Sequence, residues 1–414
     1  MSALSNGSAQ GSVPSTTRVV YVVESPFTPR DAQRFGLASM EAAGFAVVVW
    51  EVAPIFLPRS ETGDAERAQG VEIHRMAAIS DLLEAVRHLR DTDLVMLLCG
   101  TQRRQLRRHR ALHAALGPTP ARLATAVAGQ IPALTPARLR WCTTRAEARS
   151  HMWRLRQAAV EAPPVTALVR KWNSLRHRIR PLDFAWVGTT STSLEPTLLA
   201  RRTCIRPIHA FDYDLVLALE PGLDPSAWGV VLLDSMGPLH PDYTSLGLEA
   251  NRPTNDNYFG VIRAFLDGFE RATGSRVRIA AHPRAAPGSL EPWYGGRTIV
   301  YGNTVRCIAQ STLVILPNNS TAANLVVALN KPCLFLTSTN FDPILEPYVR
   351  NLSVLLNAPV QDAGLPVSAA FDTSVDQIAY GRFMADFVKR PGTPMSPFWD
   401  VVGQDIRDAD IIEP

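Results

Sequence analysis

Cysteine is scarce in this chain of 414 residues, which contains only five. They are odd in number, scattered, mostly inside apolar runs, and without the spacing of a metal site: Cys99, Cys142, Cys204, Cys307 and Cys333. Disulfide-stabilised secreted domains and cysteine-ligated metal centres are therefore not expected. We predict reduced thiols, no bound metal and a cytoplasmic protein.

Long apolar runs are also missing. The longest have the length of a strand, far short of the ~20 residues that cross a membrane as a helix. The chain does not begin with a basic segment followed by an apolar one. We therefore expect a soluble protein, or one that is peripheral at the inner membrane. Residues 1–17 are rich in Ser, Gly and Asn and are expected to form a disordered lead-in, because they have nothing to bury.

The composition is otherwise that of a globular protein, with 46% hydrophobic and 19% charged residues. A chain of this length suits two domains of about 150 to 200 residues each. We predict a first domain over residues 18–215, a second domain over residues 216–390 and a tail over residues 391–414. The boundary between the domains is expected within residues 206–228.

Strand-length apolar runs alternate with helix-length segments in the first domain. Strands are predicted at residues 18–24, 46–52, 71–75 and 94–99, and helices at residues 31–43 and 80–90. This alternation predicts a parallel, doubly wound sheet. The loop after the first strand lacks the GxGxxG pattern, which argues against a dinucleotide site there.

Positive charge is concentrated in residues 103–180. This region has sixteen arginines and one lysine against Glu147 and Glu161, a net charge of +15, whereas the whole chain carries +4. The basic residues alternate with Leu, Ala and Trp at helical spacing, so we predict a basic helical region that contacts an anionic membrane surface. A solvated helical face and RNA binding are the alternatives. No nucleic-acid motif accompanies the charge, and we expect no nucleic-acid partner.

The most informative stretch covers residues 276–336. A strand at residues 277–281 ends in His282-Pro283-Arg284, and a strand at 312–316 leads through Pro-Asn-Asn-Ser-Thr into a helix at 322–330. Ligands of parallel sheets bind at the carboxyl ends of strands, and a helix start favours anions. We therefore predict that His282 meets Ser320 and Thr321 at neighbouring strand ends and forms a nucleotide-phosphate site. Alternatively, Ser320 only caps the helix and His282 is an ordinary loop histidine.

An aspartate ends the strand predicted at residues 229–233. Asp234 could act there as a base, a nucleophile or an electrostatic stabiliser, or it could be a turn residue. The same zone holds weaker candidates, of which the second and third could instead brace the hinge between the domains: His209, Asp212, Asp214, His240 and Asp242.

The segments AAHPR and NNSTAAN, followed by ALNKPCLFL, resemble the histidine-proline and serine/threonine motifs of bacterial surface-polysaccharide glycosyltransferases of the GT-B type. This group includes bacterial sialyltransferases and β-Kdo transferases, which use CMP-activated sugars. The resemblance implies two Rossmann-like, doubly wound domains that face each other across a cleft. It places the donor phosphate on His282, Ser320 and Thr321, and we add Asn319 and Arg284 beside them. Many members carry a second acid after the first, where this chain has Ser235.

The resemblance turns the edge of the first domain toward the acceptor. Four polar residues lie near that edge: Glu24, Arg30, Asp31 and Arg34. They are either acceptor-binding residues, or Asp31 caps a helix and the arginines are solvated. The tail would cross back onto the first domain, with Trp399 as an anchor.

The resulting prediction is a metal-independent, cofactor-free glycosyltransferase of lipopolysaccharide or capsule synthesis. It would move a sugar from a nucleotide-activated donor, with CMP-Kdo or CMP-sialic acid favoured, to a glycan or lipid-linked glycan at the bacterial surface. Asp234 would give inversion as a base or retention as a nucleophile. A CDP-glycerol-type phosphotransferase, a polysaccharide pyruvyltransferase and a non-catalytic polysaccharide-assembly partner remain as alternatives.

Overall fold

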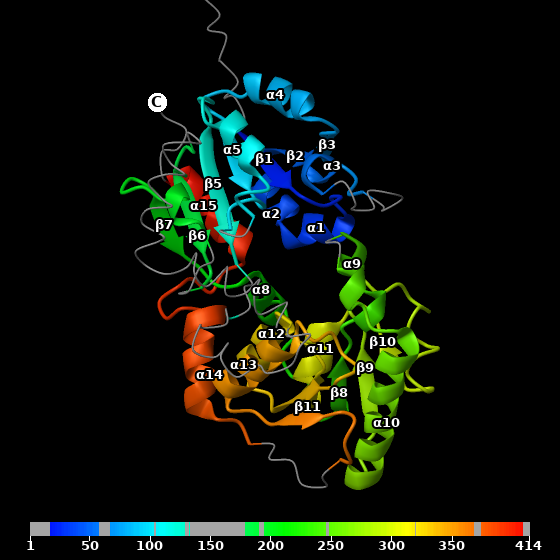
Figure 1. Ribbon diagram of the computed structural model, residues 1–414. Coiled ribbons are helices and arrows are strands. Elements are labelled where there is room, and N and C mark those ends of the chain that lie inside the picture. Colours follow the sequence, from blue (N-terminus) through cyan, green and yellow to red (C-terminus); the bar gives the residue numbers. More distant parts are fainter. Residues whose placement is uncertain are drawn as a thin grey trace, which may run out of the picture.

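The computed structural model describes residues 17–57, 67–102, 105–128, 132, 179–189, 194–245, 248–318, 320–367 and 374–408. Nearly all of the predicted lead-in, and the two basic clusters predicted between residues 145 and 180, lie outside the described residues or at their margin. The described chain forms two parallel β-sheets with helices on their faces (Figure 1).

The first sheet has the strand order β3-β2-β1-β4-β5-β6-β7, and every pair is parallel. Successive residues of β1 alternate between two apolar clusters, one on each face of the sheet, so both faces are covered. Its strands are β1 (Arg18–Val23), β2 (Ala46–Glu51), β3 (Glu72–Arg75), β4 (Leu94–Leu97), β5 (Arg122–Val127), β6 (Phe184–Val187) and β7 (Cys204–Pro207).

The second sheet repeats this plan with the order β10-β9-β8-β11-β12-β13. In both sheets the chain starts at a central strand, winds outward to one edge and then returns to build the other side, which is the doubly wound arrangement. The predicted fold class of two Rossmann-like α/β units is therefore confirmed. The strands are β8 (Gly229–Leu233), β9 (Val277–Ala280), β10 (Ile299–Val300), β11 (Ser311–Leu316), β12 (Cys333–Thr337) and β13 (Val360–Asp362).

Helices connect these strands. Those of the first unit are α1 (Pro29–Arg34), α2 (Leu37–Ala42), α3 (Ala53–Phe56), α4 (Ile79–Arg87) and α5 (Arg110–Leu116), and α8 (Phe211–Leu217) leads into the second. The second unit has α9 (Asp242–Ser245), α10 (Asn255–Thr273), α11 (Thr304–Ala309), α12 (Ala322–Ala328), α13 (Glu346–Leu356) and α14 (Gln377–Phe383), and the chain closes with α15 (Phe398–Asp408). The long helix α10 is capped by the Thr254 hydroxyl and ends at Gly274, whose φ is 70°.

The helix predicted at residues 31–43 is in fact two helices, α1 and α2, that meet at Gly36. Gly36 has a φ of 57°, and a Cβ at this position would overlap the ring of Trp399. The break therefore follows from a side chain that lies more than 350 residues away in the sequence.

The strand β5 was not predicted. Its sequence RLATAV lies inside the region that we predicted to be basic and helical, yet it pairs with β4 and β6 in the middle of the first sheet. Small residues fit here because both faces of the strand are covered, and this burial overrides the weak intrinsic preference of Ala for strands.

The final helix α15 packs on the first sheet, although it follows the second domain in sequence (Figure 1). Phe398 and Trp399 are buried in the same cluster as Tyr21. Trp399 Nε1 donates to the Arg34 carbonyl at 2.9 Å, and Trp186 Nε1 donates to Asp405 at 2.9 Å. The tail was predicted to cross back in this direction, with Trp399 as its anchor.

Candidate functional site

The carboxyl ends of the strands carry most of the predicted site residues. Asp234 follows β8, His282 follows β9, and Ser320 follows β11. The order of the sheet places β8 between β9 and β11, so His282 and Ser320 do not lie on neighbouring strand ends, and that prediction was wrong. The reason is that the order of strands along the chain does not give their order in a doubly wound sheet. Asp234 occupies the central position between them.

Asp234 is buried and both of its carboxylate oxygens accept hydrogen bonds. Oδ1 accepts from the Tyr294 hydroxyl at 2.6 Å, and Oδ2 accepts from the backbone N–H of Met236 at 3.0 Å and of His282 at 3.3 Å. Burial raises the pKa of this carboxyl, while these donors and the backbone of Ser235 act in the opposite direction. The carboxylate thus ties the end of β8 to the backbone of the loop that carries His282.

His282 is held in one tautomer. Its Nδ1 accepts the backbone N–H of Arg284 at 3.2 Å, so the ring proton is on Nε2. Burial, followed by the proximity of His240, Arg284 and Arg30, lowers the pKa of His282 to about 3. At neutral pH this imidazole is therefore uncharged and can donate one hydrogen bond from Nε2.

His240 lies against His282. The two ring centroids are 5.1 Å apart with an interplanar angle of 74°. Burial also lowers the pKa of His240, the charge of Asp242 opposes this shift, and Arg284 adds to it. Asp242 pairs with Arg284 at 3.0 Å, so the loop after β8 and the loop after β9 are joined by an ion pair as well as by the ring contact.

Arg30 approaches this group from the first domain. It lies in α1, whose N-cap residue is Thr28. The side chain of Asp31 accepts from the Thr28 backbone N–H at 3.1 Å, so Asp31 has the structural role of a capping-box residue. Arg30 remains accessible to solvent. Partial desolvation, then the charges of Arg34 and Arg284, lower its pKa. The charge of Arg30 in the first domain therefore acts on His282 and Arg284 of the second.

Asp212 of α8 interacts with Arg34 of the first domain and with Thr321 of the second. Burial raises its pKa, and Arg34 and the donors of Thr321 and Asn324 act against this rise. Within the described chain, Asp212 Oδ2 and Asn324 Nδ2 are buried without a hydrogen bond of normal geometry. Asp212 and Thr321 are thus close to each other, although they belong to different parts of the chain.

The Ser320 hydroxyl accepts the backbone N–H of Ala322, the first residue of α12, at 3.1 Å. Ser320 is not the N-cap residue of this helix, so the alternative that it caps α12 was wrong. Thr321 is the N-cap residue of a helix that has seven residues. Asn319 lies outside the described residues.

His209 and Asp214 lie at the hinge between the domains. His209 is fully buried, its Nε2 donates to the Ser396 carbonyl at 2.9 Å, and it is 3.5 Å from Asp214 Oδ1. Both oxygens of Asp214 accept the backbone N–H of Phe398, at 2.9 and 3.1 Å. Burial raises the pKa of Asp214 to about 6. These two residues join α8 to the start of α15.

Glu24 stands at the carboxyl end of β1, beside β4, where the winding direction of the first sheet reverses. Its oxygens contact Gln105 at 3.0 Å, Arg108 at 2.9 Å and His109 at 2.9 Å. Burial raises the pKa of Glu24, but His109 and Arg108 outweigh this effect and the net shift is downward. Sequence reasoning missed His109, because it stands in a run of arginines that we interpreted by charge alone.

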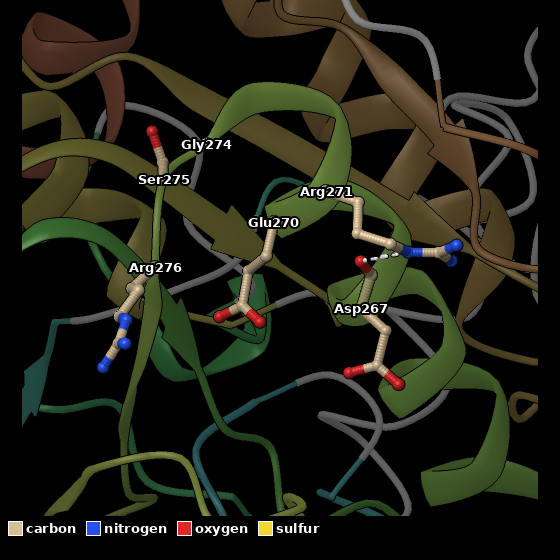
Figure 2. Close-up of a pocket in the computed structure, with 6 residues that line it drawn as sticks. All are labelled: Asp267, Glu270, Arg271, Gly274, Ser275 and Arg276. Carbon is tan, nitrogen blue, oxygen red and sulfur yellow. Dashed lines mark hydrogen bonds between the residues drawn. The ribbon is translucent and has the colours of Figure 1, made fainter.

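A surface hollow lies on the side of the second sheet where β9 begins. It is lined by residues at the end of α10 and before β9: Asp267, Glu270, Arg271, Gly274, Ser275 and Arg276 (Figure 2). This edge carries the amino end of β9, whereas His282 follows its carboxyl end. The hollow is therefore separate from the predicted site.

Among the described residues, there is no group of three or more His, Cys, Asp or Glu side chains that could hold a metal ion. No helix in the described part of the chain is long and apolar enough to cross a membrane.

The structure is thus a two-unit α/β protein in which polar residues follow the carboxyl ends of strands in both sheets. No protein-family model and no curated protein matches the sequence. Solved structures similar to this chain include the calicheamicin glycosyltransferase CalG4, with 12% identity, a TM-score of 0.46, and coverage of 96% of this chain and 98% of that one. The wall teichoic acid polymerase TagF has 10% identity, a TM-score of 0.46, and coverage of 95% and 90%. MurG of Acinetobacter baumannii has 9% identity, a TM-score of 0.42, and coverage of 95% and 99%.

Proposed function

We propose that this protein is a glycosyltransferase that uses a nucleotide-activated sugar. The observation that carries the proposal is the electrostatic interaction of Arg30 from the first domain with His282 and Arg284, which follow β9 beside the carboxyl end of β8. Ligands of doubly wound sheets bind outside this edge. Cations and a neutral N–H donor that meet here from both domains suit an anionic donor held between them.

The electrostatics of the site support a phosphate ligand. The lowered pKa values of Arg30 and His282 show that positive charge here is costly in the absence of an anion. A bound phosphate would remove this cost. When the bond from the sugar to the phosphate oxygen breaks, the electron pair stays on that oxygen, and the same donors stabilise the added negative charge.

The balance of charges favours a donor with one charge on its phosphate. Three arginines face three aspartates in this group: Arg30, Arg34, Arg284, Asp31, Asp212 and Asp242. A CMP-linked sugar has a phosphodiester with a single charge, whereas a sugar linked to a nucleoside diphosphate has two adjacent charges. Arginines that come from different domains suit separated single charges, such as the phosphodiester and the carboxylate of Kdo or sialic acid. We therefore favour a CMP-sugar donor.

The acceptor would be a glycan that meets the edge of the first domain. Glu24 is held there by Gln105, Arg108 and His109, and its side chain keeps 22% of its surface exposed. An ionised, oriented carboxylate of this kind can accept hydrogen bonds from sugar hydroxyls. For Asp234 we propose a positioning role, because all of its described contacts are internal hydrogen bonds.

The basic region at residues 103–180 would bring the enzyme to an anionic membrane surface that carries a lipid-linked acceptor. Its net charge of +15 supports this proposal. Sedimentation with vesicles tests it directly. We expect binding to vesicles with phosphatidylglycerol that declines as salt rises, and no binding to vesicles of phosphatidylcholine alone. Equal binding to both kinds of vesicle would contradict an electrostatic contact.

A nucleotide panel tests the proposed function. Thermal shifts are measured with CMP, CDP, UDP, GDP, CMP-sialic acid, CMP-Kdo and CDP-glycerol. Arg284→Gln is compared with Arg276→Gln, since both changes remove one arginine and the two residues flank opposite ends of β9. We expect cytidine nucleotides to raise the melting temperature of the wild type and of Arg276→Gln, and a much smaller rise for Arg284→Gln and His282→Leu.

The outcomes separate the hypotheses. A rise with UDP or GDP alone would keep a nucleotide-dependent transferase and remove the CMP-sugar donor. Selective binding of CDP-glycerol would favour the phosphotransferase. The absence of any shift in folded protein would remove the proposed function. Mass spectrometry of products formed from the selected donor then identifies the group that is transferred.

A further inference from the structure

Two tripeptides with the same local geometry follow the adjacent strands β8 and β9. They are His240-Pro241-Asp242 and His282-Pro283-Arg284. In each, the histidine Nδ1 accepts the backbone N–H of the residue two positions later, at 3.2 Å in both cases. The third residues then pair with each other at 3.0 Å. The structure thus contains a matched pair of histidine turns, of which the proposed function uses only one.

The shared hydrogen bond fixes the proton on each ring. An Nδ1 that accepts a backbone N–H has its lone pair occupied, so the neutral imidazole carries hydrogen on Nε2. Burial favours the uncharged form of both rings, and the charges around them come from Asp242, Arg284 and Arg30. Each ring therefore presents one N–H donor, and the two ring centroids are 5.1 Å apart.

We propose that His240 and His282 together bind one phosphate group of the donor nucleotide, each through its Nε2–H. This inference rests on the proposed function and adds His240 as a second phosphate-binding residue. A phosphate joined to a nucleoside has several free oxygens, so two donors from adjacent loops can bind different oxygens. Both hydrogen bonds strengthen when the departing sugar leaves its electron pair on the phosphate. Neither histidine needs to gain or lose a proton.

The ion pair between Asp242 and Arg284 has a positioning role in this arrangement. It joins the two loops outside the rings and keeps its side chains about half exposed, at 50% and 44%. Asp242→Asn would loosen the pair while leaving both imidazoles in place. We therefore expect this variant to weaken phosphate binding less than the loss of either histidine.

Calorimetric titration with CMP and with cytidine tests the proposal. If the nucleotide panel selects uridine nucleotides, UDP and uridine are used instead. The variants are His240→Leu, His282→Leu and the double variant, with His240→Gln as the matched control because its amide N–H replaces the Nε2–H donor. We expect each leucine variant to weaken nucleotide binding roughly tenfold to a hundredfold, the range for hydrogen bonds to a charged group. Nucleoside binding should stay unchanged, and glutamine should restore much of the loss.

Several results would overturn the proposal. If His240→Leu binds the nucleotide as the wild type does while His282→Leu does not, His240 only packs against its neighbour. Equal losses for nucleotide and nucleoside would show a general distortion of the site. If the folded wild type binds no nucleotide, the proposed function fails as well, which distinguishes that failure from the failure of this inference alone.

A spectroscopic measurement on the wild type avoids any effect of mutation on folding. Nitrogen NMR of the histidine side chains reports which ring nitrogen carries hydrogen. We expect both residues to be neutral with hydrogen on Nε2 near neutral pH, and both Nε2 signals to move on addition of the nucleotide but not of the nucleoside. Movement of the His282 signal alone would contradict a shared site.

Discussion

Replacement of Asp234 separates a positioning role from a catalytic one. In Asp234→Ala, the backbone N–H groups of Met236 and His282 and the hydroxyl of Tyr294 lose their acceptor inside the protein. A buried polar group without a partner costs about 1–3 kcal/mol. Some of this cost is offset, because the buried carboxylate itself is disfavoured. We expect a loss of roughly 3 kcal/mol or more in the free energy of unfolding.

Asp234→Asn should behave differently. The amide oxygen can take the place of Oδ2 and accept from both backbone N–H groups, while the amide N–H donates to the Tyr294 hydroxyl, which turns to accept. The two backbone hydrogen bonds survive, but the turned Tyr294 hydroxyl leaves its own proton without its present acceptor, so the loss should be about 1–3 kcal/mol, smaller than in Asp234→Ala. Tyr294→Phe removes only the 2.6 Å contact, and its loss should also be smaller than that of Asp234→Ala.

The assays are urea denaturation, nucleotide binding and turnover of the selected donor. If Asp234 positions the His282 loop, Asp234→Asn keeps nucleotide binding and its kcat falls less than about tenfold, far less than the 10²–10⁴-fold typical of a lost general base. An inactive Asp234→Asn that is stable and binds nucleotide would refute the positioning role and restore the base or nucleophile. Equal destabilisation by asparagine and alanine would refute the hydrogen-bond reasoning.

Three other predictions concern stability. An unfolded His282 takes up a proton below its ordinary pKa of 6.5, whereas the folded one stays neutral down to about pH 3. The free energy of unfolding should therefore fall as pH decreases through this interval, by at most ~1.4 kcal/mol per pH unit. Urea denaturation of His282→Gln at several pH values should lack this part of the pH dependence. Trp399→Ala should cost about 3–5 kcal/mol of first-domain stability, whereas Trp399→Phe should lose only about 1 kcal/mol for the hydrogen bond to Arg34. Equal losses for the two variants in urea denaturation would contradict the role of the indole as an anchor. Gly36→Ala should destabilise through its positive φ and through overlap with the Trp399 ring, so calorimetry should show a smaller effect in a Trp399→Ala background.

Much of the fold could be predicted because its signals are local. Apolar runs of strand length, such as those that became β1, β8 and β11, end in polar loops, and their alternation with helices indicates parallel units. The break at Gly36 and the strand β5 could not be predicted in this way. Gly36 responds to Trp399, and β5 is stabilised by burial between β4 and β6, so both depend on contacts that are distant in sequence.

The candidate site could likewise be predicted only in part. The strand-end positions of Asp234 and His282 follow from the sequence, but the order of the strands does not, and this led to the wrong placement of His282 beside Ser320. The partners of Asp234 were also beyond reach. Tyr294 lies 60 residues away, and nothing in its neighbourhood marks it as the donor to a strand-end carboxylate.

The significance of His240 depends entirely on the pairing of two strands. The tripeptides that begin at His240 and His282 are 42 residues apart and too short to carry weight singly. In a doubly wound sheet the second strand pairs beside the first, which sets Leu233 opposite Ala280. The short turn after β8 then returns the chain to the same edge, where the two rings meet. The His-Pro pair that recurs at the ends of these two strands therefore supports the proposed shared phosphate site only because β8 and β9 are paired.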